Sequence, residues 1–282
     1  VRLERRIQNI ALTDPGTGWS WNLPEVSFFG EATSPTVLRL SLPDQHLISL
    51  PREKVEIGHS RMVADLSLAP DAGLTWRHGA IDGADLMLEA QSGWTGAAKT
   101  LSAEIRARAP ATAPPNSYAV TLSSTEVSIP KPLLDQIDPT GLLDPLVDEI
   151  RLDGTAALRA PLDRFALERG RLALNAATVR DAELRWGDMK VSASGQIETD
   201  LRGYATGEID LKLTKWREMI RIARRSGKID RSMIDAIEQG LRFVSIIAGD
   251  GEDVELTLNL SGGKVRIGPV AIGDAPRLAP PA

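Results

Sequence analysis

In this 282-residue chain, few residues with chemically reactive side chains are spaced in a pattern that could support catalysis. The three histidines, His46, His59 and His78, fall on separate predicted strands, without the spacing of metal ligands. Cysteine is absent, which excludes disulfides, thiolate metal sites and a cysteine nucleophile. We therefore expect no catalytic residue, no metal and no cofactor, and we predict that the protein is not an enzyme.

Two loops are similar to ligand-binding motifs but lack the flanking elements or the ligand spacing that such motifs need. The segment Ser261-Gly262-Gly263-Lys264 has the residue types of a phosphate-binding loop, but it separates two predicted strands instead of preceding a helix. Asp250, Glu252 and Asp253 could offer carboxylates to Ca²⁺, yet the ligand spacing of a calcium loop is incomplete. The first loop is predicted to be a hairpin turn, and neither loop predicts a ligand.

Charge is concentrated in one basic segment between positions 215 and 231. Seven basic and two acidic residues give this segment a net charge of +5, whereas the whole chain carries −5, which leaves −10 elsewhere. The acidic balance argues against a nucleic-acid partner. The segment is either a solvated helix face or a surface that attracts an anionic membrane or an acidic protein partner. Its basic residues are Lys215, Arg217, Arg221, Arg224, Arg225, Lys228 and Arg231.

The elements around these residues are mostly strands, and they are clearest between Gly170 and Trp216. Apolar residues occupy every second position there, which predicts four strands with one dry and one wet face. The segment Trp186-Gly187-Asp188-Met189 predicts a tight turn between two of them. The residues predicted to line an apolar groove are Leu172, Leu174, Leu184, Trp186, Val191, Ile209, Leu211 and Leu213.

The same alternation recurs on both sides of this stretch. Helical spacing appears only between Leu133 and Ile150, where two short helices are expected, and from Trp216 to Ala248. These patterns predict a mainly β (α+β) fold, in which a long, curved, largely antiparallel meander forms a groove or half-barrel. A few helices, two of them near the C-terminus, would cover one face or end of the sheet.

The domain organisation follows from the one Pro/Ala-rich break in the first half. We predict a single elongated domain over residues 1–282, with the alternative of two β subdomains, 1–109 and 117–275, joined by loop 109–116. Residues 276–282 are predicted to form a flexible tail. No run in the chain approaches the roughly 20 apolar residues that cross a bilayer, and the first residues do not form a signal peptide.

Four segments in a fixed order resemble a known family. They are Asp14-Pro15-Gly16-Thr17-Gly18-Trp19-Ser20-Trp21, Ala182-Glu183-Leu184-Arg185-Trp186-Gly187, Thr214-Lys215-Trp216-Arg217-Glu218, and the stretch from Gly263 to Pro276. Together they resemble the uncharacterised alphaproteobacterial envelope family named domain of unknown function 2125. The resemblance implies a periplasmic protein, anchored to the inner membrane by an N-terminal helix that this chain lacks.

The family is in turn similar to AsmA-like proteins, whose repeated strands form a groove suited to lipid chains. This similarity implies a non-enzymatic envelope protein that binds or handles phospholipid in an apolar β-groove. The alternative is a structural or interaction module, in which the same residues form a closed core and the protein docks on an inner-membrane protein.

Overall fold

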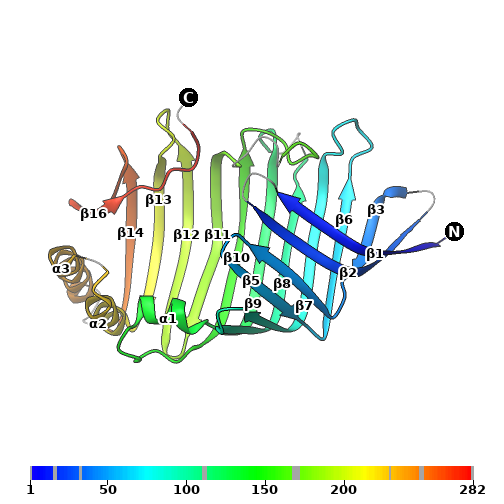
Figure 1. The fold of residues 1–282 in the computed structure, drawn as a ribbon. Coiled ribbons are helices and arrows are strands. Elements are labelled where there is room, and N and C mark those ends of the chain that lie inside the picture. Colours follow the sequence, from blue (N-terminus) through cyan, green and yellow to red (C-terminus); the bar gives the residue numbers. More distant parts are fainter. Residues whose placement is uncertain are drawn as a thin grey trace.

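The computed structural model describes residues 2–14, 18–31, 34–109, 113–166, 172–228, 230–247 and 251–280. Within these residues, sixteen strands form one hydrogen-bonded sheet in which every pairing is antiparallel. The predicted meander is confirmed, because β7 to β16 follow one another across the sheet in chain order (Figure 1). The strands are β1 (Arg2–Asp14), β2 (Trp19–Glu31), β3 (Ser34–Ser41), β4 (Gln45–Leu50), β5 (Glu53–Gly58), β6 (Arg61–Leu68), β7 (Trp76–Ala90), β8 (Thr95–Ala107), β9 (Ser117–Ser128), β10 (Leu146–Leu158), β11 (Leu174–Trp186), β12 (Met189–Thr199), β13 (Ala205–Thr214), β14 (Asp253–Ser261), β15 (Lys264–Ile267) and β16 (Val270–Asp274).

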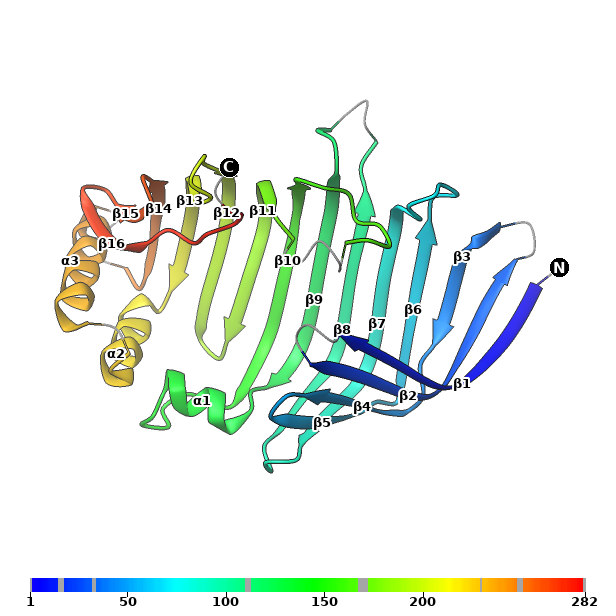
Figure 2. The same cartoon turned by 45° about the horizontal axis from the view of Figure 1, so that its top comes forward.

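The sheet branches near its N-terminal end, because two long strands each pair with two shorter ones on the same side. β7 pairs with β6 along its first part and with β5 along its last part. In the same way, β2 pairs first with β4 and then with β3, while β1 covers its other edge. Strands β1, β2, β4 and β5 therefore leave the line of the main sheet and cross in front of one end of it (Figure 2).

The segment from Gly170 to Trp216 contains three strands in its described part, and not the four that we predicted. The first two predicted strands form one continuous strand, β11, which contains a bulge between Val179 and Ala182. At the bulge two residues, Arg180 and Asp181, face the single residue Ser194 of β12, so the alternation changes parity without a turn. The predicted turn at Trp186–Met189 is confirmed, with Gly187 at a φ of 57°.

Three helices accompany the sheet in the described residues: α1 (Lys131–Ile137), α2 (Trp216–Ser226) and α3 (Arg231–Ile247). The two C-terminal helices were predicted, but only one of the two helices expected between Leu133 and Ile150 forms. The chain after α1 instead wraps around the buried carboxylate of Asp138, which accepts hydrogen bonds from the backbone amides of Thr140 and Leu143 at 3.1 and 2.7 Å. These side-chain bonds satisfy the amides without a second helix, and β10 then begins at Leu146.

Loop 109–116 joins two strands that pair directly with each other, β8 and β9, although residues 110–112 lie outside the described part. The described part of the predicted tail, 276–280, lies against the β12–β13 loop and the start of β11. The backbone amide of Leu278 donates to Gly203, and its carbonyl accepts from Leu174. Positions 281 and 282 are outside the described residues.

Candidate apolar binding groove

The main candidate site is a continuous apolar surface on one face of the sheet, which we call the apolar lane. Residues that are paired across neighbouring strands lie on the same face, so the register of the sheet identifies its members. At about 4.8 Å per strand, a row across ten strands is about 43 Å long. The middle row of the lane, from β3 to β14, is Leu40, Ala64, Ile81, Ala103, Leu122, Leu152, Ala182, Ala193, Leu211 and Leu256.

A second apolar row runs beside the first and contains three glycines. Gly79 belongs to this row and leaves room for the indole of Trp76, since a Cβ at this position would lie 3.0 Å from the ring atom Cζ3. The bulge in β11 keeps the row continuous by bringing Val179 to the apolar face. From β6 to β14 the row is Leu66, Gly79, Ile105, Val120, Gly154, Val179, Gly195, Ile209 and Leu258.

Each end of the lane is covered, by different elements. At the C-terminal end, Trp216 of α2 and Leu241 of α3 pack on Val254 and Leu256 of β14, and all four are less than 9% exposed. At the N-terminal end, Leu23 and Val26 of the crossing strand β2 pack on the main sheet. Their buried partners are Leu42, Met62 and Leu86.

The middle of the lane is less covered, and it contains a cavity of about 520 Å³. Its lining comes from six strands, β3 and β6 to β10, and it includes the lane residues Ile81, Ala103, Ile105 and Leu122. These four side chains are only partly buried, unlike those at the two ends. Cavities that bind small apolar ligands have a comparable volume and lining, so the middle of the lane could hold an apolar chain.

Of the eight residues predicted to line a groove, five lie on the face that carries the lane and three lie elsewhere. Leu184, Val191, Ile209, Leu211 and Leu213 lie on the face that carries the lane, because they pair with one another or with lane residues. Several of them lie toward the covered end, where Leu211 and Leu213 contact the cluster around Trp216.

The other three predicted groove residues lie away from the lane. Leu174 packs against Tyr118 and Leu158 at the rim of the sheet. Leu172 precedes β11 and is 59% exposed. Trp186 lies beside α1 and α2, and its indole Nε1 donates to the carbonyl of Asp144 at 2.7 Å.

Sequence reasoning missed the central lane residues from β6 to β10. Their alternation indicated strands, but small and large apolar residues occur together in these strands, so no apolar groove was predicted there. Only the strand pairing shows that Ile81, Ala103 and Leu122 are neighbours.

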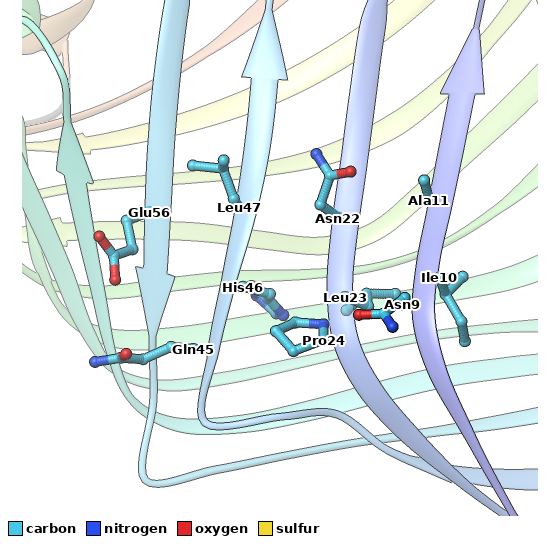
Figure 3. Close-up of a pocket in the computed structure, with 10 residues that line it drawn as sticks. All are labelled: Asn9, Ile10, Ala11, Asn22, Leu23, Pro24, Gln45, His46, Leu47 and Glu56. Atoms are coloured by element: carbon cyan, nitrogen blue, oxygen red, sulfur yellow. The ribbon is translucent and has the colours of Figure 1, made fainter.

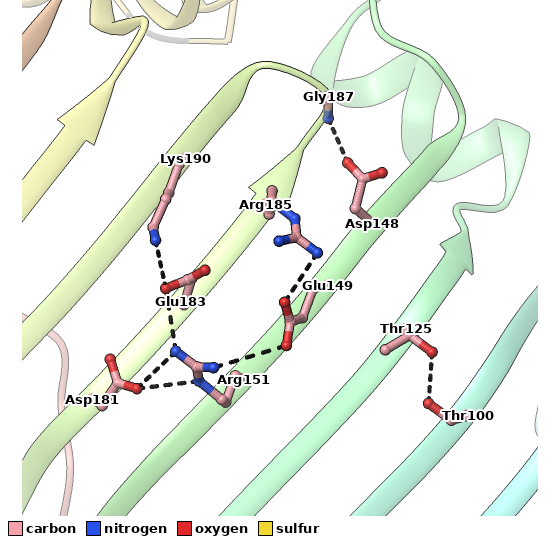
Figure 4. Close-up of polar contacts among 10 residues, drawn as sticks. All are labelled: Thr100, Thr125, Asp148, Glu149, Arg151, Asp181, Glu183, Arg185, Gly187 and Lys190. Carbon is pink, nitrogen blue, oxygen red and sulfur yellow. Dashed lines mark hydrogen bonds and ion pairs between the residues drawn. The ribbon is translucent and has the colours of Figure 1, made fainter.

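The opposite face of the sheet is polar and carries ion pairs between neighbouring strands (Figure 4). Arg151 of β10 lies 3.1 Å from Asp181 and 3.3 Å from Glu183, both on β11. Glu183 in turn pairs with Lys190 of β12 at 2.8 Å, which holds the pKa of this carboxyl below its usual value. This face is therefore suited to water, and the lane is the face that can hold an apolar ligand.

The predicted basic patch divides into paired and unpaired cations. Lys215 pairs with Glu252, and Arg224 of α2 bridges to Asp235 and Glu238 of α3. The guanidinium of Arg217 lies 4.6 Å from the centre of the Trp216 ring. The remaining side chains have no ion pair or hydrogen bond in the part of the chain that the structure describes, and they are Arg221, Arg225, Lys228 and Arg231.

Two of the three histidines lie side by side, and the third lies apart from them. His46 and His59 are buried with ring centres 5.4 Å apart, and their ring nitrogens have no hydrogen-bond partner among the described residues. Burial, and then the nearby His59, lowers the pKa of His46 to about 4, so the ring is neutral at physiological pH. His78 lies apart from them, 3.1 Å from Glu104.

A second depression, of about 550 Å³, lies where β1, β2, β4 and β5 meet (Figure 3). Its polar side chains are Asn9, Asn22, Gln45, His46 and Glu56, which come from four strands.

The described residues contain no group of three or more potential metal ligands. They also contain no helix that is long and apolar enough to cross a membrane. Asp250, one of the three carboxylates considered as Ca²⁺ ligands in the sequence, lies outside the described residues.

A long antiparallel sheet with one apolar face, partly covered by helices, defines the class as a β-groove protein. No curated protein and no solved structure matches the chain. The family model for an uncharacterised protein conserved in bacteria, DUF2125, matches residues 1–276. The chain therefore belongs to the DUF2125 family, as its four sequence segments suggested.

Proposed function

We propose that this protein is a non-enzymatic lipid-handling protein of the bacterial cell envelope, whose apolar lane holds the acyl chain of a phospholipid. The observation that carries the proposal is the unbroken middle row of the lane, with a cavity of about 520 Å³ over its partly buried centre. An acyl chain is an extended apolar ligand, and it gains about 0.8 kcal/mol for each buried CH₂ group.

The experiment compares one bulky substitution on the two faces of the same strand. In Ala103→Trp, an indole would fill the cavity from the middle of β8. In Thr100→Trp, the same indole would lie on the polar face, where the hydroxyl groups of Thr100 and Thr125 are 2.7 Å apart across the strands. Native mass spectrometry and lipid extraction of detergent-free preparations should find phospholipid with the wild type and with Thr100→Trp, and much less with Ala103→Trp. Absence of lipid from the wild type would contradict the proposal.

A second candidate function is a structural module that docks on an inner-membrane protein. It is favoured by the covered ends of the lane, where side chains such as Trp216 and Val26 are almost fully buried as in a closed core. Under this alternative the wild type would contain no lipid, and Ala103→Trp would reduce stability without changing any bound ligand.

The periplasmic location and an inner-membrane anchor are also part of the proposal. They are supported by the resemblance of the four sequence segments to an envelope family. Protease treatment of intact spheroplasts would test them, since a periplasmic protein should be digested there without lysis.

A further inference from the structure

We propose that the end of the molecule formed by α1 and α2 docks on the surface of an anionic phospholipid bilayer. The proposal does not depend on lipid in the apolar lane, since it rests on different residues. It starts from the four unpaired cations in and after α2, which are the only part of the predicted basic patch whose charges are not used within the described protein.

Three of these cations form a charged face on α2 and directly after it. Arg221 and Arg225 are four residues apart and so lie one above the other on the surface of α2, and Lys228 follows the helix after Gly227. All three are exposed. Arg224 lies beside them but is held by Asp235 and Glu238 of α3. The charged face therefore consists of cations that are free to meet an external anion.

An apolar pocket opens on another side of α2, at the same end of the molecule. It has a volume of about 500 Å³ and lies between α1, the β11–β12 turn and α2. Met219 and Ile222 line it from α2, and Leu133 and Ile137 line it from α1. Leu133 is 48% exposed and Ile137 39%, although both are large apolar side chains. Lys228 also lines the pocket, so a cation stands at its edge.

This combination fits a bilayer surface better than another occupant. A helix that lies on a membrane places apolar side chains among the lipid chains and basic side chains at the headgroups. Here both kinds of residue are exposed at the same end of the molecule, and α1 and α2 lie together at that end in both views (Figures 1 and 2).

The overall charge distribution supports the same orientation. The segment 215–231 carries +5 and the rest of the chain −10, so an anionic surface attracts this end and repels the remainder. Each basic residue near an anionic membrane contributes about 1 kcal/mol to binding.

The test uses vesicles of phosphatidylcholine with or without 30% phosphatidylglycerol, and measures binding by co-sedimentation. The wild type should bind the anionic vesicles and release them at high salt. The variant Arg221→Gln/Arg225→Gln/Lys228→Gln should bind about a hundredfold more weakly, because three charges near the surface are lost. The matched control, Arg52→Gln/Arg61→Gln/Arg77→Gln, removes three exposed cations elsewhere and should change binding by less than about twofold.

A fluorescent label tests the apolar half of the surface. Since the chain contains no cysteine, Leu133→Cys and Thr100→Cys each accept a single environment-sensitive dye. Anionic vesicles should shift the emission of the dye at position 133 to shorter wavelengths and leave the dye at position 100 unchanged.

Three results would overturn the proposal: no binding of the wild type to anionic vesicles, equal losses in both triple variants, or equal shifts at both labelled positions. Binding to an acidic protein but not to vesicles is a case of the first of these results. Ala103→Trp should bind vesicles as the wild type does, so a failure of the groove proposal and a failure of this one are distinguishable. Thermal melts of all variants check that the fold is intact.

Discussion

The middle and the C-terminal end of the sheet have the same strand pattern but a different environment. Leu122 and Leu152 in the middle are partly buried, whereas Val254 and Leu256 at the end are covered by α2 and α3. Both pairs lie on the same face and are linked by one register. The difference shows that alternation creates an apolar face, while the elements that fold over it decide whether that face becomes a core or stays available for a ligand.

The largest expected effect comes from removing the helix anchor at the covered end. Trp216→Ala should lower the free energy of unfolding by about 3–5 kcal/mol, because Trp216 is 1% exposed and its loss leaves a large cavity under α2. Trp216→Phe should cost much less, since the indole Nε1 has no hydrogen-bond partner among the described residues. Urea denaturation measures both, and equal losses would show that cavity size does not determine the effect.

A pH-dependent effect is expected at the other covered end, where β2, β4 and β5 cross the sheet. The pKa of His46 is about 4 in the folded protein and 6.5 without burial, so the unfolded chain binds the proton first as the pH falls. The contribution of neutral His46 to the free energy of unfolding is fully present above pH 6.5, and it is lost as the pH falls from 6.5 to 4. The loss amounts to about 3 kcal/mol.

Thermal melts between pH 7.5 and 4.5 measure this dependence. His46→Leu should flatten it, whereas the control His78→Gln should keep it, since His78 is the histidine outside the buried pair. The same slope in all three proteins would assign the acid sensitivity to the carboxylates alone.

The smallest effects should separate the two faces in the middle of the sheet. Leu152→Ala on the lane should lower the free energy of unfolding by about 2 kcal/mol. This is at the low end of the range for leucine-to-alanine substitutions, because the side chain is only partly buried. The neighbouring Arg151→Met should cost less than about 1 kcal/mol, because Arg151 is 44% exposed and its ion pairs with Asp181 and Glu183 are screened by water. A larger loss for Arg151→Met than for Leu152→Ala in urea denaturation would contradict this view of the two faces.

Much of the local structure was predictable from residue spacing. Period-two alternation indicated the strands, and Gly187 indicated the turn between β11 and β12. The bulge at Arg180 and Asp181 was not predicted, because a change of parity has the same sequence signature as a turn between two strands. The prediction of a second helix after Leu133 was also wrong. The sequence could not show this, because the side-chain hydrogen bonds of Asp138 that replace the helix depend on its burial in the folded loop.

The candidate sites were predictable only in part. The basic segment was visible in the sequence, but its division into paired and free cations depends on the placement of Asp235 and Glu238 beside Arg224. The lane residues Ile81, Ala103 and Leu122 are 19 or more positions apart, and no local pattern links them.

By itself, the sequence determined that this protein has a long sheet with one apolar and one polar face, because side chains of a strand alternate regardless of what surrounds it. It also determined the family to which the chain belongs. Only the tertiary structure decided which part of the apolar face is covered, since that depends on where β2, α2 and α3 pack. Such contacts join residues far apart in the chain, and their strength depends on the area that packing removes from water.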